Sequence, residues 1–336
     1  MIAMDAEWGL AMRLDSTFAY PWNMTLGAIQ DLETIQAVGE RIGMHCKRLG
    51  VHINFAPVVD LNTNPKNPII GNRSFGETKE NVTLRALALM KGLQDEGVYA
   101  TAKHFPGHGD VAVDSHFDLP VINKSRAQLD SLELYPFREL IKAGVGSMMM
   151  AHLYIPAIDS TANQATSLSK KNVTDLLRNE LGYNGLTFTD ALEMKGVAKF
   201  YPAGEAAVQS LIAGNDMLCL PGDVANSIQK IMEAIATGKL TQADIDTKLK
   251  KVLISKYHLG LHTNTPIALD NLAEDLNAAT NAIKQKLSEQ ALTLLRLENK
   301  KLLPLFSKKK IIYVGIGINQ MNTFAAELKE NYHAKI

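Results

Sequence analysis

The segment 103–116 is the part of the chain richest in side chains that could carry out acid–base chemistry. Its fourteen residues include three histidines, two aspartates and one lysine. Pro106, Gly107 and Gly109 allow tight backbone turns, which predicts a loop of defined shape. Histidine changes its charge near neutral pH, so a loop of this composition is suited to giving and taking protons.

Asp114 and His116 are predicted to act together within this loop. Residues two apart in an extended stretch point to the same side of the chain, so the carboxylate can accept a hydrogen bond from one imidazole nitrogen. That bond fixes the tautomer and makes the imidazole more basic, while the other nitrogen stays able to transfer a proton. The pair is therefore predicted to be a general acid/base.

Two other interpretations of the loop remain open on these residues. Histidine and aspartate at short spacing are also usual metal ligands, although a second ligand group at matching spacing is hard to find elsewhere in the chain. A solvated surface loop is the third interpretation, but such loops seldom concentrate histidine. We expect no metal and no cofactor, and a metal-dependent enzyme would instead lose activity to a chelator.

Asp190 is the second candidate for chemistry, because it follows the apolar run at 186–189. If that run is a strand, the carboxylate projects beyond its C-terminal end. An aspartate between a strand and a helix can equally serve as the N-cap of that helix. A carboxylate together with a proton donor is the pair that retaining glycoside hydrolysis requires.

The elements that must position these residues alternate along the first three quarters of the chain. Helices are predicted at 31–49, 79–94, 125–143, 171–180 and 206–213, and strands at 53–59, 98–102, 145–151, 186–189 and 217–220. Two further helices are predicted at 224–237 and 242–257. Short buried strands separated by amphipathic helices indicate βα units and a parallel sheet.

A closed barrel fits this pattern better than an open sheet. No glycine-rich fingerprint or P-loop follows any predicted strand, which argues against a nucleotide-binding sheet. Ionisable residues instead follow nearly every strand, namely Asp5, Asp60, Lys103, His104, His152 and Asp190. A (β/α)8 barrel brings those ends together at one mouth. With about six strands counted, we expect an α/β fold of TIM-barrel type that lacks its first βα unit.

Three regions are expected along the chain. The barrel would occupy residues 1–262, and the polar stretch at 262–266 predicts a domain edge. Residues 263–298 would form a linker with a long helix around 272–295. Residues 299–336, with a strand at 310–316, would begin an incomplete second α/β domain.

Charge and composition narrow the possible partners. The chain has 336 residues, with 35 basic and 35 acidic side chains, so it lacks the basic excess of a nucleic-acid binder. No window approaches about 18 consecutive apolar residues, which argues against a membrane span. We expect a monomer, located either in the cytoplasm or in the periplasm.

At the level of motifs, the chain resembles glycoside hydrolase family three, in its β-N-acetylglucosaminidase branch. The run Lys103-His104-Phe105-Pro106-Gly107-His108-Gly109-Asp110, continuing to Asp114-Ser115-His116, is similar to the acid/base loop of that branch. The run Phe188-Thr189-Asp190-Ala191-Leu192-Glu193-Met194 is similar to its nucleophile strand. Shorter stretches at 5–13, 55–60 and 71–76 fit in the same order, so the resemblance covers about residues 1–260.

This resemblance implies a retaining exo-hydrolase that removes terminal β-linked N-acetylglucosamine without a cofactor. Asp190 would be the nucleophile and His116 the acid/base, assisted by Asp114. The hydroxyls of the terminal sugar would be held by Asp5, Arg13, Arg73, Lys103 and His104. Glu7, Asp60, Asp110 and His108 would support these loops. The carbohydrate partner would be a muropeptide or a chitooligosaccharide.

Some features depart from the family or favour a different activity. Trp8 and Ala6 stand where the family has small or amide side chains, so the edge of the sugar pocket or its leaving-group side is expected to differ. A β-glucosidase or β-xylosidase of the same superfamily would resemble a pattern with Asp-Trp, whereas Ala191 follows Asp190 here. Two more possibilities stay open: phosphate replaces water as the acceptor, or the chain is an inactive carbohydrate-binding fragment.

Overall fold

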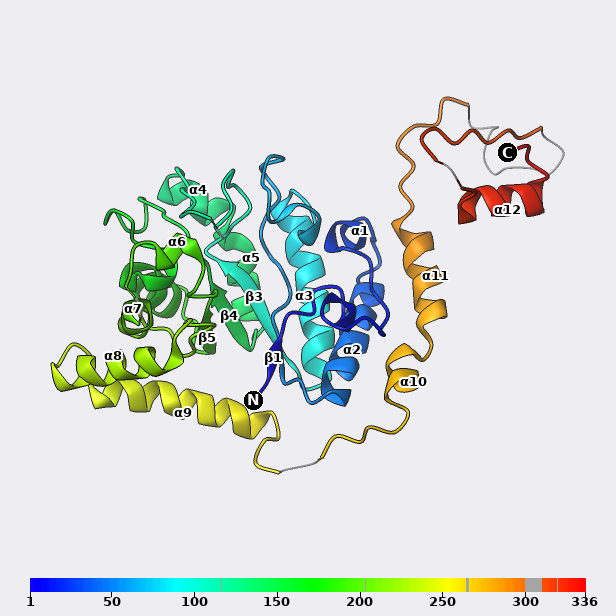
Figure 1. The fold of residues 1–336 in the computed structure, drawn as a ribbon. Helices are drawn as coiled ribbons and strands as arrows, with labels where there is room; N and C mark the ends of the chain where they lie inside the picture. The colour runs from blue at the N-terminus through cyan, green and yellow to red at the C-terminus, as the bar shows by residue number, and fades with distance from the viewer. Residues whose placement is uncertain (116, 203, 264–265, 300–309, 319) are drawn as a thin grey trace. The chain divides into compact units, whose positions relative to one another are not determined.

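The computed structural model describes residues 1–115, 117–202, 204–263, 266–299, 310–318 and 320–336. Within these residues the chain divides into two compact units, Met1–Leu292 and Thr293–Ile336. The first unit contains all the described strands and most of the described helices (Figure 1).

A parallel sheet forms the centre of the first unit. Its five strands follow one another in sequence order: β1 (Ala3–Met4), β2 (Ile53–Asn54), β3 (Tyr99–Phe105), β4 (Ser147–Met150) and β5 (Leu186–Thr189). All neighbouring pairs are parallel, and Met217 adds an isolated parallel bridge to Phe188. Neighbouring parallel strands in sequence order are typical of a TIM-type barrel, so the predicted α/β class is confirmed.

The helices that connect the strands are largely those predicted. They include α2 (Leu32–Arg48), α3 (Lys79–Asp95), the π-helix η4 (Lys171–Glu180), α7 (Glu205–Ala213), α8 (Val224–Ala236) and α9 (Gln242–His258), with the short α1 (Asn23–Gly27) and α6 (Lys195–Ala198). Three 3₁₀ turns, η1 (Leu10–Met12), η2 (Gly71–Arg73) and η3 (Thr166–Leu168), lie between them. Asp31 caps α2 by accepting the backbone N–H of Glu33, as expected for an N-cap aspartate.

Two of the predicted helices are divided. The helix expected at 125–143 is α4 (Arg126–Ser131) followed by α5 (Leu134–Lys142). Pro136 has no N–H to donate, so it is tolerated only in the first turn of a helix, and α5 starts just before it. The helix expected at 272–295 is α10 (Leu272–Asn277) and α11 (Thr280–Ala291), because Ala279 has a φ of +55°.

Close packing fixes the helices against each other and against the sheet. In α2 and α3, which lie side by side (Figure 1), Gly39 and Gly92 face the partner helix. A Cβ atom on Gly92 would lie 2.2 Å from the carbonyl oxygen of Gln36, so only glycine permits this approach. The rings of Phe105 and Phe137 meet edge-on at 5.2 Å and anchor the end of β3 to α5.

The last quarter of the chain differs from its predicted organisation. The first compact unit extends to Leu292, so it includes α10 and α11, which the sequence places in a linker. In the second unit the described residues form α12 (Thr323–Tyr332) and an isolated bridge between Ile312 and Lys335, where a strand at 310–316 is predicted. That this unit begins a second α/β domain stays a prediction.

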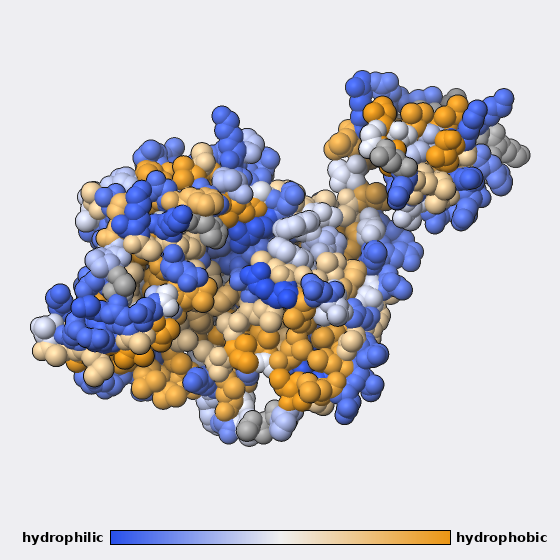
Figure 2. Space-filling view, in the orientation of Figure 1, coloured by the Kyte–Doolittle hydropathy of each residue, from blue (hydrophilic) through white to orange (hydrophobic). Residues whose placement is uncertain are grey.

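The described helices include none with the length and apolar character needed to cross a bilayer. On the face shown in Figure 2, hydrophilic side chains gather around a hollow at the centre of the first unit.

Candidate active site

A cavity of about 710 Å³ lies at the C-terminal ends of the strands. Each of the five strands, or the residue directly after it, contributes to its lining: Met4, Phe55, Lys103, Met149 and Phe188. This end of the sheet is where barrel enzymes build their active sites. The combination of apolar walls with a few charged groups is typical of a small-molecule site.

Most of the predicted site residues meet in this cavity. Its described lining includes Asp5, Arg13, Arg73, Lys103, His104 and Asp190. Asp114 is half-buried and is not among the described lining residues; its carbonyl oxygen accepts the N–H groups of Phe117 and Asp118. His116 lies outside the described residues, so the predicted pairing of Asp114 with His116 stays a prediction.

Asp5 is held between two cations. Its Oδ1 lies 2.8 Å from Nζ of Lys103, and its Oδ2 accepts a hydrogen bond of 2.8 Å from Arg13. Burial favours the neutral acid, but Lys103 and Arg13 outweigh it and hold the pKa of Asp5 below its ordinary value. The Lys103 side chain is only 2% exposed, whereas that of Arg13 is 47% exposed, so Arg13 forms the open edge of this pair.

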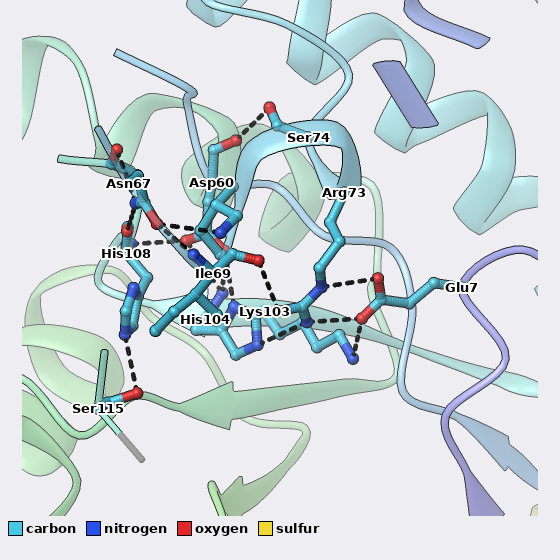
Figure 3. Close-up of polar contacts among 12 residues, drawn as sticks. Glu7, Asp60, Asn67, Ile69, Arg73, Ser74, Lys103, His104, His108 and Ser115 are labelled. Carbon is cyan, nitrogen blue, oxygen red and sulfur yellow. Dashed lines mark hydrogen bonds and ion pairs between the residues drawn. The ribbon is translucent and has the colours of Figure 1, made fainter. Parts of the chain in front are cut away.

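Glu7 forms a second, deeper anchor. Its carboxylate receives two hydrogen bonds from Arg73, of 3.0 and 2.7 Å, and lies 2.7 Å from Nζ of Lys103 (Figure 3). Although burial would raise it, these two cations lower the pKa of Glu7 to about 2. A bidentate pair of this kind fixes the plane of the guanidinium as well as its position.

Asp60 links three backbone and side-chain donors at the end of β3. It accepts a 2.6 Å hydrogen bond from Nδ1 of His104 and the backbone N–H groups of His104 and His108 (Figure 3). Burial would raise the pKa of Asp60, but His104 and His108 keep it below the ordinary value. Nε2 of His104 faces Arg73 at 3.4 Å, so the guanidinium donates and this nitrogen accepts.

His108 connects this cluster to the predicted acid/base loop. Its Nε2 lies 3.2 Å from Oγ of Ser115, the residue after Asp114. Burial, together with His104, lowers the pKa of His108 to about 4, so its ring is neutral. His108 also lines the cavity, although the sequence indicates only a supporting role for it.

The path of the loop is fixed by close backbone contacts. The side-chain amide of Asn67 donates to the carbonyl oxygens of His108 and Gly109, at 2.8 and 3.0 Å. A Cβ atom on Gly109 would lie 1.6 Å from the carbonyl oxygen of Leu61, so this position requires glycine. Nothing in the sequence pattern points to Asn67, because its role depends on a segment folded back over it.

Asp190 lies directly after β5, as predicted. Its N–H donates to the carbonyl of Met150, and its Oδ1 accepts the N–H of Ala191 at 2.8 Å. Burial would raise the pKa of Asp190, but His152, His104 and the Ala191 N–H outweigh it and keep the carboxylate ionised. A role for Asp190 as a helix cap is excluded, because α6 begins only at Lys195, with Met194 as its N-cap.

The apolar floor of the cavity is a feature that sequence reasoning does not identify. Phe55 and Phe188 meet edge-on with ring centroids 5.2 Å apart, beside Met149 and Met217. Cys219 also lines the cavity, where burial and the charge of Asp190 raise its pKa to about 12. Its thiol is therefore neutral and does not compete with Asp190 as a nucleophile.

Over the part of the chain that the structure describes, no three His, Cys, Asp or Glu side chains converge in a way that could hold a metal ion.

Comparisons with known proteins agree with this geometry. The model of the family described as the glycosyl hydrolase family 3 N-terminal domain matches residues 1–254. Among curated proteins, β-hexosaminidase A of Pseudoalteromonas piscicida is 33% identical, over 97% of this chain and 58% of that protein.

Two solved structures are similar over 93% of this chain. One is a glycoside hydrolase family 3 β-N-acetylglucosaminidase from Paenibacillus sp. strain FPU-7, with 37% identity and a TM-score of 0.83 over 60% of that chain. The other is a β-glucoside phosphorylase, with 27% identity and a TM-score of 0.84 over 58% of that chain. The present chain therefore spans less than two thirds of the length of each of these relatives.

Proposed function

The chain belongs to glycosyl hydrolase family 3, and on that premise we propose that it carries the active site of a β-hexosaminidase that removes terminal β-linked N-acetylglucosamine with retention of configuration. One observation carries the proposal. An ionised carboxylate, Asp190, shares a cavity large enough for a sugar ring with a cluster of partnered carboxylates and cations.

The charged cluster is suited to binding the hydroxyl groups of one sugar ring. Asp5 supplies acceptors, while Lys103, Arg73 and Arg13 supply donors, and all four line the cavity. Each charge already has a partner within the protein, so binding a neutral sugar does not leave an isolated buried ion. Charge-assisted hydrogen bonds of this kind are stronger and more directional than neutral ones.

The first chemical step is displacement at the anomeric carbon. An oxygen of Asp190 attacks that carbon, and the bond from the carbon to the leaving oxygen breaks, giving a covalent glycosyl ester. The leaving oxygen takes a proton from His116, a role that rests on the sequence because His116 lies outside the described residues. Asp114 would support the imidazole.

The second step releases the sugar. His116, now neutral, takes a proton from water as the water oxygen attacks the anomeric carbon, and the ester bond to Asp190 breaks. Both the carboxylate and the protonated imidazole are regenerated. Two successive inversions give the β-configured product.

Trapping the intermediate tests both the activity and the nucleophile. A slow fluorinated N-acetylglucosaminide should label the protein covalently, and peptide mapping should place the label on Asp190. Asp175→Asn, which changes an exposed carboxylate of η4, is a matched control that should be labelled at the same rate. A label on another residue, or turnover of the 4-nitrophenyl glucoside but not of the N-acetylglucosaminide, would contradict the proposal.

Phosphorolysis is a second candidate, favoured by the similarity to the β-glucoside phosphorylase. Phosphate would then attack the ester in place of water and yield the sugar 1-phosphate. Turnover of the aryl N-acetylglucosaminide with and without phosphate distinguishes the two reactions. Free N-acetylglucosamine as the product in both cases would exclude phosphorolysis.

For the part of the substrate that leaves, we propose two classes of compound. Muropeptides and chitooligosaccharides both present a terminal β-linked N-acetylglucosamine. Comparing kcat/KM for a chitooligosaccharide and a muropeptide would decide between them.

A further inference from the structure

His152 is a fully buried residue that the reaction scheme above does not use. It follows β4, and the sequence places it among the ionisable residues at strand ends. Although those ends form the mouth of the barrel, His152 is not among the described residues that line the cavity. Its ring instead lies between Ser167 and the carbonyl group of Ala191.

The two ring nitrogens of His152 contact two different segments. Nε2 lies 2.9 Å from the carbonyl oxygen of Ala191, and Nδ1 lies 2.7 Å from Oγ of Ser167. A carbonyl oxygen can only accept, so Nε2 carries a hydrogen and donates it to Ala191. The imidazole therefore ties the segment after β5 to the 3₁₀ turn η3.

Two hydrogen bonds hold the backbone of Ala191, one at its carbonyl and one at its N–H. Its carbonyl oxygen accepts from His152, while its N–H donates to Oδ1 of Asp190 at 2.8 Å. The orientation of the Asp190 carboxylate thus depends on the position of Ala191, and the position of Ala191 depends on the imidazole.

The Ser167 end of this connection is itself fixed. Ser167 is fully buried, its N–H donates to the carbonyl of Ala151 at 3.0 Å, and its carbonyl accepts from the side-chain amide of Asn215 at 2.7 Å. Since Ala151 directly precedes His152, the turn and the end of β4 form one braced unit. A rigid support of this kind is what a precisely oriented reactive group requires.

We propose that His152 is a positioning residue for the nucleophile, which holds the backbone of Ala191 so that the N–H of that residue aims the Asp190 carboxylate at the anomeric carbon. The inference rests on the proposed function, in which Asp190 is that nucleophile. The competing explanation is a core histidine whose bonds only satisfy its burial. His45, which is buried in α2 and is not among the described residues that line the cavity, is a buried histidine away from the site.

Three substitutions separate these explanations. His152→Gln keeps a donor near the position of Nε2, His152→Phe removes both ring nitrogens at similar volume, and Ser167→Ala removes the far support. Misplacing a reacting group by about 1 Å costs on the order of 100-fold in rate, so His152→Phe should lower kcat by that factor with KM changed less than about threefold. His152→Gln should recover most of the loss, and Ser167→Ala should fall in between.

His45→Phe is the matched control for the loss of a buried histidine. It should leave kcat unchanged. If His152→Phe leaves kcat unchanged as well, or if His152→Gln loses as much kcat as His152→Phe, the positioning role is refuted.

A second readout does not depend on turnover. Titration of the Asp190 carboxyl carbon by ¹³C NMR should show a higher pKa in Ser167→Ala than in the wild type, because the imidazole that holds the Ala191 backbone loses its support while it stays in place. His152→Phe also removes the direct effect of His152 on this carboxylate, so the rise in that variant should be larger. The other groups that act on this carboxylate, His104, His108, Arg73 and Cys219, are unchanged in these variants.

The kinetic assay and the NMR titration test different claims, so each can contradict one claim without the other. A wild-type protein that does not hydrolyse the N-acetylglucosaminide contradicts the proposed function, and the NMR titration then decides the structural claim by itself. An unchanged Asp190 pKa in Ser167→Ala overturns the inference whether or not the wild type is active.

Discussion

Two walls of the cavity hold their carboxylates in different ways. The proposed sugar-binding wall is formed by Asp5, Arg73, Lys103 and His104, which line the cavity, together with their partners Glu7 and Asp60. Its carboxylates pair directly with cationic or imidazole side chains. The proposed nucleophile wall is formed by Asp190 and Ala191, which line the cavity, together with His152 and Ser167, which do not, and its carboxylate is held by a backbone N–H. Among the residues that the structure describes, no ion pair joins Asp190.

The difference corresponds to what each wall must do. A carboxylate paired with an ammonium or guanidinium group is stable and well oriented, but its electron pairs are engaged. A nucleophile needs an ionised but available oxygen. Asp190 is kept ionised by His152, His104 and the Ala191 N–H without a direct cationic partner among the described residues, so binding and attack are assigned to carboxylates in different environments.

Removing the nucleophile should have the largest effect and should leave the sugar-binding wall intact. Asp190→Ala is expected to lower kcat by about 10⁴-fold or more, since covalent catalysis is lost, while N-acetylglucosamine binding measured by calorimetry persists. Added azide should restore activity and give the α-glycosyl azide. A variant that loses sugar binding as fully as turnover would show that the two walls are not separable.

Breaking the sugar-binding wall should affect binding and stability together. Glu7→Gln leaves Arg73 and Lys103 without their shared buried carboxylate, which should lower the free energy of unfolding by about 3 kcal/mol and raise KM. Asp216→Asn, which disrupts the buried pair with Arg178 outside the cavity, is the matched control. This variant should lower the free energy of unfolding, measured in urea, by a similar amount but leave KM unchanged.

The same carboxylate predicts how stability depends on pH. The pKa of Glu7 is about 2 in the folded protein against an ordinary value of 4.5, so its contribution is complete above pH 4.5 and is lost as the pH falls toward 2. This contribution is roughly 3 kcal/mol. In urea unfolding from pH 6 to 2.5, the free energy of unfolding should therefore fall more steeply below pH 4.5 in the wild type than in Glu7→Gln.

His108 causes a separate loss of folding stability at higher pH. Its pKa is about 4 in the folded protein and 6.5 ordinarily, so the unfolded chain takes up its proton first as the pH falls from 6.5 to 4. Parallel curves for wild type and Glu7→Gln below pH 4.5 would contradict the assignment of the lower step to Glu7.

Changing the open edge of the sugar-binding wall should have the smallest effect. Arg13 and Asp5 form a half-exposed ion pair, and such pairs contribute up to about 1 kcal/mol, so Arg13→Ala should scarcely change the melting temperature. KM should rise by several-fold, since a donor to the sugar is removed. Arg126→Ala, which changes another exposed ion pair, should leave both the melting temperature and KM unchanged. An equal rise in KM in that variant would contradict a role for Arg13 in sugar binding.

What the sequence by itself determines is local in origin. The apolar run at 186–189 is β5 and is followed by Asp190, as expected, because a short buried strand needs only its own residues to be recognised. The ionisable residues at strand ends predict a shared mouth, and Asp5, Lys103, His104 and Asp190 do line one cavity. The break at Pro136 is also local, but it escapes an analysis based on periodicity alone. The break at Ala279 has no such local cause, because an alanine does not favour a φ of +55°.

What only the tertiary structure decides is which of these groups touch. Glu7 and Arg73 are 66 residues apart, and Asp60 and His104 are 44 apart, so no spacing in the sequence predicts their bonds. His152 follows its strand much as Asp190 does, yet its ring contacts Ala191 and Ser167 and it is not among the described residues that line the cavity. Periodicity determines which residues follow a strand, but the direction of a side chain depends on the neighbouring strands and loops that pack against it.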